Sequence, residues 1–241
     1  MLRRIDGDFY DSEYQYINSD KAIEILSNYD NLVFMISIGS AHGKGVTLVN
    51  KSEYDKKIVE YGNNYIVQEK IEQHENLANF NASSVNILRI TSLYWKENVY
   101  ILGSILRVGA PGSFCDHTGY KNTTPRIVKV DDSGNIVVKA ISPDDGFIYN
   151  DLFGKEITGT IPKYKNIIDT IKHEHLKFTH HKIIGWDITV NSDNEPICLE
   201  FNTYCPGVVQ TQMVCGSIFS KKTSEGKCIL DEILKKNIRL R

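Results

Sequence analysis

The sequence predicts a protein of the α+β class, and three observations lead to that prediction. Near the start of the chain, residues 32–68 follow the order strand, glycine turn, strand, helix, strand. The middle of the chain is rich in apolar runs joined by short polar turns, as in β-hairpins. The 241 residues, of which 41% are hydrophobic, suffice for one large domain or for two closely joined lobes.

The first part of the chain is predicted to begin with a helix and a buried strand. Ser19 has the character of an N-cap, because apolar residues follow it at helical spacing. The apolar run 32–36 predicts a buried strand, and the small residues of 39–45 predict a turn that leads into a strand at 46–49. A second helix carries Tyr54 and ends at Gly62, and residues 65–68 predict a third strand.

The strands of the middle are predicted to pair as hairpins. Residues 85–93 and 99–108 would be neighbours joined by a turn at 96–98, and residues 126–130 and 136–140 would form a second pair.

The last part of the chain repeats the same pattern. Pro162 predicts the start of a helix. Residues 183–190 and 197–201 predict a further hairpin, and residues 230–234 predict a closing helix.

Composition excludes several classes of protein. The formal net charge is -2, whereas a nucleic-acid-binding domain usually carries a basic excess. The 5 cysteines are odd in number and contain no C-x-x-C pair, which argues against a disulfide framework or a zinc site. The first residues lack the apolar segment of a signal peptide, and no apolar stretch is long enough to span a bilayer. We therefore expect a cytoplasmic protein without membrane insertion.

The strongest chemical signal is a pair of carboxylates and an amide near the C-terminus. Alternate residues of a strand share a face, so Glu200 and Asn202 would point to one side and Phe201 to the other. Asp187 lies on the preceding strand of the same predicted hairpin and could lie beside them. Such hard oxygen ligands suit magnesium held together with substrate phosphates. The alternative is a hairpin with ordinary polar residues on a solvated face.

A second signal is the glycine turn after the first buried strand. Small residues let backbone amides approach phosphates, and Lys44 could reach a phosphate as a point charge. The alternative is a plain hairpin turn, since a glycine turn alone is weakly specific.

A third signal is an arginine within each of two successive apolar strands. Arg89 and Arg107 are both flanked by apolar residues, and an arginine among core residues usually faces an anion or a buried carboxylate. A structural ion pair, for example of one of them with Asp116, explains the pattern equally well.

Three further groups have bland and functional interpretations. Tyr10, Tyr14 and Tyr16 could stack on a ligand or could cover the edge of the core near the N-terminus. Cys115 could belong to a thiol site, although a structural cysteine is more common. A cluster of histidines could bind metal or simply form a polar helix end; its members are His173, His175, His180 and His181.

Taken together, these motifs resemble the ATP-grasp superfamily. The closest resemblance is to the sugar-transfer-associated ATP-grasp family of capsule and exopolysaccharide synthesis, and a more distant one is to D-alanine–D-alanine ligase. The resemblance covers about residues 18 to 215. It rests on Ser37-Ile38-Gly39-Ser40 to Gly43-Lys44-Gly45-Val46, Gln68-Glu69, Ser83-Ser84-Val85-Asn86 to Arg89, Arg107-Val108-Gly109, and Gly185-Trp186-Asp187 to Glu200-Phe201-Asn202.

The resemblance implies an ATP-grasp fold with the nucleotide held between two lobes. Residues 1–67 would form the small lobe with the phosphate loop, and residues 68–241 the large lobe with the hinge and the magnesium site. The usual N-terminal domain is expected to be absent from this chain, and a partner subunit could supply it.

The resemblance also implies roles for individual residues. Arg107 would contact phosphate or acyl-phosphate, with Arg89 nearby, and Asp187, Glu200 and Asn202 would hold Mg2+. For the ribose, Glu72 and Glu75 remain alternatives. The implied ATP-binding residues are Ser40, Gly43, Lys44, Gln68, Glu69, Lys70, Ile71 and Glu75.

The implied activity is an ATP- and magnesium-dependent carboxylate–amine ligase that forms an acyl-phosphate. Its substrates would be a small-molecule carboxylate and an amine, which could be linked to a sugar, in the modification of cell-surface polysaccharide or peptide. Three departures from the family pattern are Met35 in place of the usual lysine, the expected lack of an N-terminal domain, and His117 with a reduced glycine turn after it. They leave two alternatives: a nucleotide-binding or structural subunit without ligase activity, and phosphoryl transfer to a hydroxyl.

Overall fold

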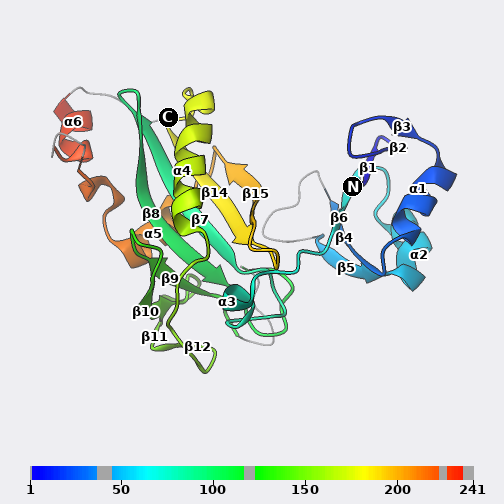
Figure 1. Cartoon of the computed structure of the whole chain (residues 1–241), viewed down its shortest axis with the longest axis horizontal. Helices are drawn as coiled ribbons and strands as arrows, with labels where there is room; N and C mark the ends of the chain where they lie inside the picture. The colour runs from blue at the N-terminus through cyan, green and yellow to red at the C-terminus, as the bar shows by residue number, and fades with distance from the viewer. Residues whose placement is uncertain (1, 37–44, 117–122, 223–226, 236–241) are drawn as a thin grey trace. The chain divides into compact units, whose positions relative to one another are not determined.

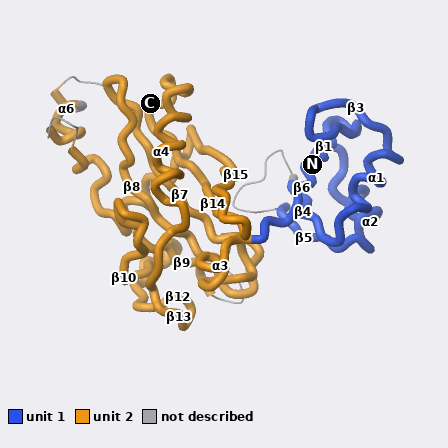
Figure 2. The backbone as a smooth tube through the Cα atoms, in the orientation of Figure 1, with its two compact units in different colours: residues 1–72 blue, residues 73–241 orange. Residues whose placement is uncertain are grey.

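The computed structural model describes residues 2–36, 45–116, 123–222 and 227–235. The chain divides into two compact units, residues 1–72 (unit 1) and 73–241 (unit 2), which Figure 2 colours separately. The sequence placed the division between residues 67 and 68, and the last strand of unit 1 extends beyond that point to Glu69. The functional roles given to the two lobes remain predictions.

Unit 1 is a six-stranded antiparallel sheet with two helices (Figure 1). The helices α1 (Ser19–Ser27) and α2 (Tyr54–Glu60) contribute buried residues to the core of the unit. The strands, in the spatial order β3-β2-β1-β6-β4-β5, are β3 (Tyr16–Ile17), β2 (Asp8–Tyr10), β1 (Leu2–Ile5), β6 (Tyr65–Glu69), β4 (Asn31–Ile36) and β5 (Thr47–Asn50).

Strand β4 shows how the sequence pattern determines the two faces of this sheet. Leu32 and Phe34 are fully buried in the core formed with the helices. Their neighbours alternate to the opposite face, so Met35 points away from this core and is half-buried. This face remains free of α1 and α2.

Unit 2 is built on a seven-stranded antiparallel sheet whose central strands are long. Its spatial order is β11 (Ile148–Tyr149), β10 (Ile136–Ile141), β9 (Arg126–Val130), β8 (Asn98–Val108), β7 (Ile87–Trp95), β14 (Ile183–Val190) and β15 (Pro196–Asn202). A small hairpin of β12 (Asp151–Leu152) and β13 (Lys155–Glu156) and four helices complete the unit: α3 (Glu75–Ala78), α4 (Tyr164–His175), α5 (Val208–Cys215) and α6 (Ile229–Lys235).

The two faces of the unit 2 sheet differ in chemistry. Helix α4 covers one face, where Leu88, Ile90 and Trp186 join a large apolar core with Ile167 and Ile171 of the helix. Helix α5 lies on the other face, since a Cβ on Gly103 of β8 would fall 2.6 Å from Thr211 of α5. The second face also carries the charged residues described below.

Most predicted strands and helices are present, and two helix starts were wrong. The N-cap of α1 is Asn18, whose side chain accepts a hydrogen bond from the Lys21 amide, so Ser19 is already helical. Helix α4 begins at Tyr164, because Lys163 adopts a left-handed conformation with φ 55° after Pro162. Among the described residues, no helix is both long and apolar enough to cross a membrane.

Candidate functional site

Three predicted site residues lie at the centre of the unit 2 sheet. Arg89, Arg107 and Asp187 occupy the adjacent strands β7, β8 and β14, and Asp187 is the register partner of Arg89. Each is flanked by core residues of the α4 face and therefore points to the opposite face. All three are buried, with exposed fractions of 5%, 7% and 3% respectively.

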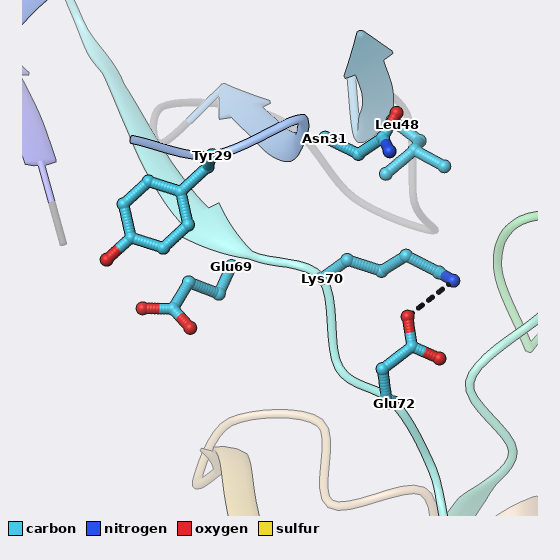
Figure 3. A pocket seen from close by; sticks show the side chains of 6 residues that line it. All are labelled: Tyr29, Asn31, Leu48, Glu69, Lys70 and Glu72. Atoms are coloured by element: carbon cyan, nitrogen blue, oxygen red, sulfur yellow. Dashed lines mark hydrogen bonds and ion pairs between the residues drawn. The ribbon is translucent and has the colours of Figure 1, made fainter. Parts of the chain in front are cut away.

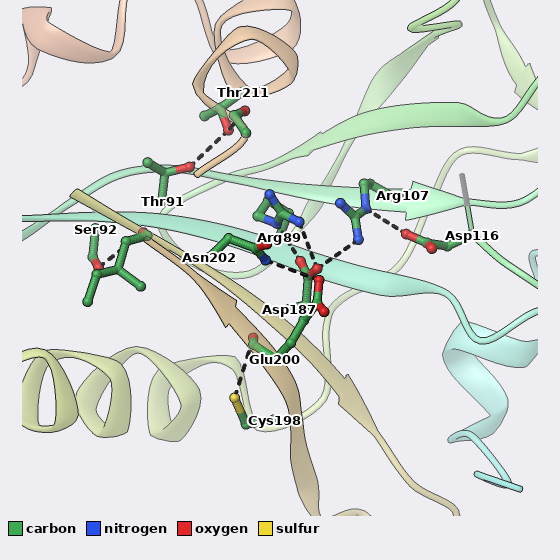
Figure 4. A network of polar contacts seen from close by, with 12 residues as sticks. Arg89, Thr91, Ser92, Arg107, Asp116, Asp187, Cys198, Glu200, Asn202 and Thr211 are labelled. Atoms are coloured by element: carbon green, nitrogen blue, oxygen red, sulfur yellow. Dashed lines mark hydrogen bonds and ion pairs between the residues drawn. The ribbon is translucent and has the colours of Figure 1, made fainter. Parts of the chain in front are cut away.

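The carboxylate of Asp187 is held by both arginines (Figure 4). The Nε of Arg89 donates a short hydrogen bond to Oδ1, and its Nη2 donates to Oδ2 at 2.7 Å. The Nη2 of Arg107 donates to the same Oδ2 at 3.1 Å. This bidentate contact and its additional donor fix the direction of both guanidinium groups.

Asp116 completes a charged quartet by pairing with Arg107. The Nε of Arg107 lies 2.6 Å from Oδ2 of Asp116, and both side chains are buried. Burial lowers the pKa of Arg107, but the carboxylates of Asp116 and Asp187 outweigh it, and the net direction is upward. The ion pair considered from the sequence is therefore present for Arg107, while Arg89 pairs with Asp187 instead.

Glu200 and Asn202 lie on the edge strand β15, beside Asp187. Glu200 is the register partner of Asp187, and Asn202 is that of Gly185. The Nδ2 of Asn202 donates to Oε1 of Glu200 at 3.1 Å, which shows that the two side chains share a face. Phe201 points to the other face, where its ring centroid lies 5.5 Å from that of Trp186. The hairpin thus brings the three predicted metal ligands together on one face.

The donor chemistry of this group fits magnesium, with one restriction. Glu200 is solvent-exposed and Asn202 half-buried, so their oxygens are accessible to a hydrated ion that keeps several waters. Asp187 already accepts three hydrogen bonds from Arg89 and Arg107, which leaves about one lone-pair site of its carboxylate. Among the described residues, no group of three His, Cys, Asp or Glu side chains is arranged as a metal site, so the ligand set depends on the amide of Asn202.

Three glycines allow loops to pack closely against the charged quartet. A Cβ on Gly207 would lie 2.4 Å from Nη1 of Arg89, and φ at this residue is +77°. A Cβ on Gly185 would lie 2.3 Å from the carbonyl oxygen of Pro206, and one on Gly109 would lie 2.5 Å from that of Cys115. Glycine is therefore required where the segment before α5 and the segment before Asp116 approach the arginine strands.

Unit 1 contains a separate pocket at the end of β6 (Figure 3). Its volume is about 280 Å³, and it includes Glu69 and Lys70, two of the predicted ATP-binding residues. The charge of Glu69 and its hydrogen bond with Tyr29 raise the pKa of that phenol. Lys70 forms an ion pair of 2.8 Å with Glu72. The pocket is lined by Tyr29, Asn31, Leu48, Glu69, Lys70 and Glu72.

The remaining predicted ATP-binding residues are not all brought together. Gln68 is exposed on β6, and Ile71 is half-buried two residues after that strand ends. Glu75 belongs to unit 2, where it begins α3 and lines a different cavity of about 740 Å³. The predicted phosphate-loop residues lie outside the described part of the chain; they are Ser40, Gly43 and Lys44.

Two residues next to the predicted site were not identified from the sequence. Tyr29 was missed because it lies between predicted elements, and nothing local shows that it meets Glu69. Gly207 was noted only as part of a Pro-Gly pair, and its contact with Arg89 depends on how α5 packs on the sheet. The glycine before a predicted helix was the only available signal.

Comparison with known families gives one match. The family model described as sugar-transfer associated ATP-grasp matches residues 56–225, which is more than half of the chain. A search of curated proteins finds no match.

Comparison with solved structures supports the same fold. D-alanyl-alanine synthetase A from Vibrio cholerae O1 biovar eltor is similar with a TM-score of 0.50 and 14% identity, over 90% of this chain and 53% of that protein. A RiPP-associated ATP-grasp ligase from Chryseobacterium gregarium, in complex with ADP and with a leader and core peptide, aligns with a TM-score of 0.45 and 16% identity, over 92% of this chain and 54% of that one.

N5-carboxyaminoimidazole synthetase from Staphylococcus aureus, complexed with ADP, aligns with a TM-score of 0.43 and 14% identity. That alignment covers 76% of this chain and 36% of the synthetase, so the chain spans only about a third to a half of these structures. At such identity the likeness concerns the fold alone.

Proposed function

Because the chain belongs to the sugar-transfer associated ATP-grasp family and has the ATP-grasp fold, we propose that it is an ATP-dependent carboxylate–amine ligase. A substrate carboxylate oxygen would attack the γ-phosphorus of ATP and release ADP. The nitrogen of an amine would then attack the acyl carbon, releasing phosphate and a proton and leaving an amide. Such chemistry requires positioned charges and no protein nucleophile.

The observation that carries this proposal is the pair of arginines fixed by Asp187. Buried ions are costly to desolvate, and such a network adds little stability that an apolar core would not supply. A site for a transferring phosphoryl group, in contrast, needs cations that are already oriented. Arg107, whose direction is set by both Asp116 and Asp187, would contact the phosphate or acyl-phosphate, and Arg89 would lie next to it.

Glu200 and Asn202 would hold magnesium, with Asp187 contributing the remaining capacity of its carboxylate. The ion would offset the charge of the phosphate oxygens when bound. The exposure of Glu200 beside the buried quartet supports this division, since the edge strand can accept a hydrated ion while the arginines stay fixed.

In unit 1, the pocket at the end of β6 supports the proposed adenine and ribose contacts. Glu69 and Lys70 line it, and Gln68 and Ile71 flank it in the chain. Glu72 lines the pocket and Glu75 does not, which favours Glu72 for the ribose. Lys44, Gly43 and Ser40 would cover the phosphates.

The substrates and the setting are proposed from the family description. We propose a small carboxylic acid and an amine, with a link to sugar transfer, in cell-surface polysaccharide or peptide modification within the cytoplasm. A partner subunit could complete the substrate site. Nucleic acid is not proposed as a partner, because the chain has a net charge of -2.

A second candidate is a nucleotide-binding or structural subunit without ligase activity. It is favoured by Met35, an uncharged residue on the helix-free face of β4, where the family resemblance leads us to expect a lysine. Loss of a cation near the triphosphate would weaken ATP binding or turnover.

The two candidates are separated by trapping the acyl-phosphate. The chain is incubated with ATP, magnesium, hydroxylamine and a panel of carboxylic acids, and hydroxamate and ADP are measured. The ligase predicts hydroxamate and ADP in equal amounts with at least one acid, and their loss in Arg107→Ala. Binding of ATP without hydroxamate from any acid would favour the structural subunit, and a phosphoester product would indicate phosphoryl transfer.

A further inference from the structure

The N-terminal hairpin of unit 1 presents a group of tyrosines that the proposed ligase chemistry does not use. From the sequence, Tyr10, Tyr14 and Tyr16 could either stack on a ligand or cover the edge of the core. Tyr14 is 62% exposed and Tyr16 is 66% exposed, so covering the core does not explain these two rings. We refer to Tyr10, Tyr14 and Tyr16 together with Arg3 as the tyrosine platform.

The side chains of the tyrosine platform hold one another in place. The guanidinium carbon of Arg3 lies 4.0 Å from the centroid of the Tyr14 ring. Its Nη1 donates to the carbonyl oxygens of Asp11, at 2.9 Å, and Ser12, at 3.2 Å. The rings of Tyr10 and Tyr16 meet edge to face with centroids 6.3 Å apart. The rings are therefore oriented before any ligand binds.

The backbone at Tyr14 is strained in a way that presents its ring. Tyr14 has φ 60°, a left-handed conformation that is uncommon for a bulky residue. The turn is held by Asp11, whose Oδ1 accepts hydrogen bonds from the amides of Glu13 and Gln15, both at 2.9 Å. A glycine would adopt this turn freely, so packing and turn geometry give no reason for a tyrosine here. Strain of this kind at an exposed aromatic residue points to a binding role.

The platform lies on the same sheet face as Met35. Strand register pairs Tyr16 with Tyr10, Tyr10 with Arg3, Arg3 with Ile66, and Ile66 with Met35. Directly paired residues of neighbouring strands share a face, so this row runs across five strands on the face that α1 and α2 leave free. The platform also lies outside residues 56–225, which the family model matches.

The size and charge of the platform restrict its ligand. Two rings that are about two-thirds exposed offer on the order of 250 Å², whereas a stable protein partner needs about 800 Å² on each side. Residues 3–16 carry four acidic side chains and two arginines, which disfavours an anion such as nucleic acid. Arg3 stacks on Tyr14 and would repel a cation at this ring.

We propose that the tyrosine platform binds a neutral saccharide. A sugar ring combines an apolar C–H face with a rim of hydroxyl groups, and it matches the apolar face and hydroxyl of a tyrosine. Because no phosphate or nucleotide is required, this binding is independent of the proposed ligase site and is measured without ATP or magnesium. Failure of one proposal therefore leaves the other untouched.

The experiment is an NMR titration of the full chain with neutral hexa-saccharides of glucose, mannose and galactose. Stacking on a C–H face tolerates different hexoses, so each is expected to bind in the millimolar range and to shift the amides of residues 10–16. Tyr14→Gly and Tyr16→Ala should each weaken binding by about tenfold. Tyr14→Gly should leave the thermal midpoint unchanged or raised, because it relieves the left-handed conformation.

Tyr204→Ala is the matched control, since Tyr204 is a 96% exposed tyrosine of unit 2, and it should bind sugar like the wild type. The proposal is overturned if none of the three sugars shifts residues 10–16, or if the two platform variants bind as tightly as the control. A decaproline peptide is titrated in parallel. Shifts at residues 10–16 with this peptide and with none of the sugars would assign the platform to a peptide instead.

Discussion

The sheet of unit 2 buries a polar network on each face, and the two networks differ in charge. On the face with Arg89, four ionised side chains form a quartet with two positive and two negative groups. On the α4 face the network is neutral. There Nε1 of Trp186 donates to Oγ of Ser92 at 2.8 Å, Ser92 Oγ lies 2.8 Å from Nδ1 of His175, and His175 Nε2 lies 2.9 Å from the His181 carbonyl oxygen.

The neutral network is explained by stability. If Nε2 of His175 carries the proton, Trp186, Ser92 and His175 each donate one hydrogen bond to the next group, and no buried donor in the chain is left over. The charged quartet has no such explanation, because ions cost more to bury than their mutual attraction returns. The contrast indicates that the quartet serves a ligand and the neutral network serves the core.

The neutral network also shows why residue types alone do not identify a catalytic site. Ser92 and His175 have the hydrogen-bonded geometry of a nucleophile and its base, yet both are 0% exposed. Burial lowers the pKa of His175 and keeps it neutral. The pair cannot meet a substrate and is structural.

The largest expected effect is removal of the shared carboxylate. Asp187→Ala leaves two buried guanidinium groups without their partner and should destabilise unit 2 by about 3–5 kcal/mol. In the neutral network, Ser92→Ala should cost about 1–3 kcal/mol. Both tryptophans, Trp95 and Trp186, belong to unit 2, so urea unfolding followed by tryptophan fluorescence reports on this unit. A cost for Asp187→Ala that is no greater than that for Ser92→Ala would contradict the comparison.

A smaller effect is expected from a methyl group placed against Arg89. Gly207 and Gly146 have nearly equal φ angles of +77° and +76°, but a Cβ on Gly146 would meet nothing within 4 Å. Gly146→Ala should therefore cost only the left-handed strain, about 1–2 kcal/mol. Gly207→Ala should cost more in urea unfolding and should also weaken ATP binding, because Arg89 must move. Equal behaviour of the two variants would show that the position of Arg89 is unimportant.

The smallest effect is the pH dependence of the neutral network. Because burial holds the folded-state pKa of His175 below its usual value of 6.5, its contribution to stability is complete above that pH. It decreases as the pH falls below 6.5, since the unfolded chain then binds a proton that the folded chain resists. The urea midpoint should fall between about pH 7.5 and about pH 5.5, and less so in His175→Gln. His173→Gln, an exposed control, should keep the wild-type slope.

The sequence predicted the part of the site that lies within one hairpin. Asp187, Glu200 and Asn202 come together because neighbouring strands pair and alternate residues share a face, and both rules are local. The contact of Arg89 with Asp187 joins residues that are 98 apart in the chain. It depends on which strands become neighbours in the sheet, and this information is absent from any short window.

The elements that were missed are short or lack contrast between faces. Strands β1, β2 and β3 span two to four residues each, too few for an alternating pattern to show. Helix α5 was missed because its apolar residues do not gather on one side; Thr211 is its single buried residue. The helix end at Gly62 was predicted correctly, since its φ of +70° reflects a local preference of glycine.

The central claim, that the quartet and the edge strand form a nucleotide–magnesium site, is tested most directly by calorimetric titration of ATP with and without magnesium. The wild type and Glu195→Gln, which removes an exposed carboxylate near the turn of the same hairpin, should bind ATP only when magnesium is present. Glu200→Gln should lose at least about tenfold in affinity while its unfolding curve stays unchanged. Magnesium-dependent binding of equal strength in Glu200→Gln and Glu195→Gln would contradict the account.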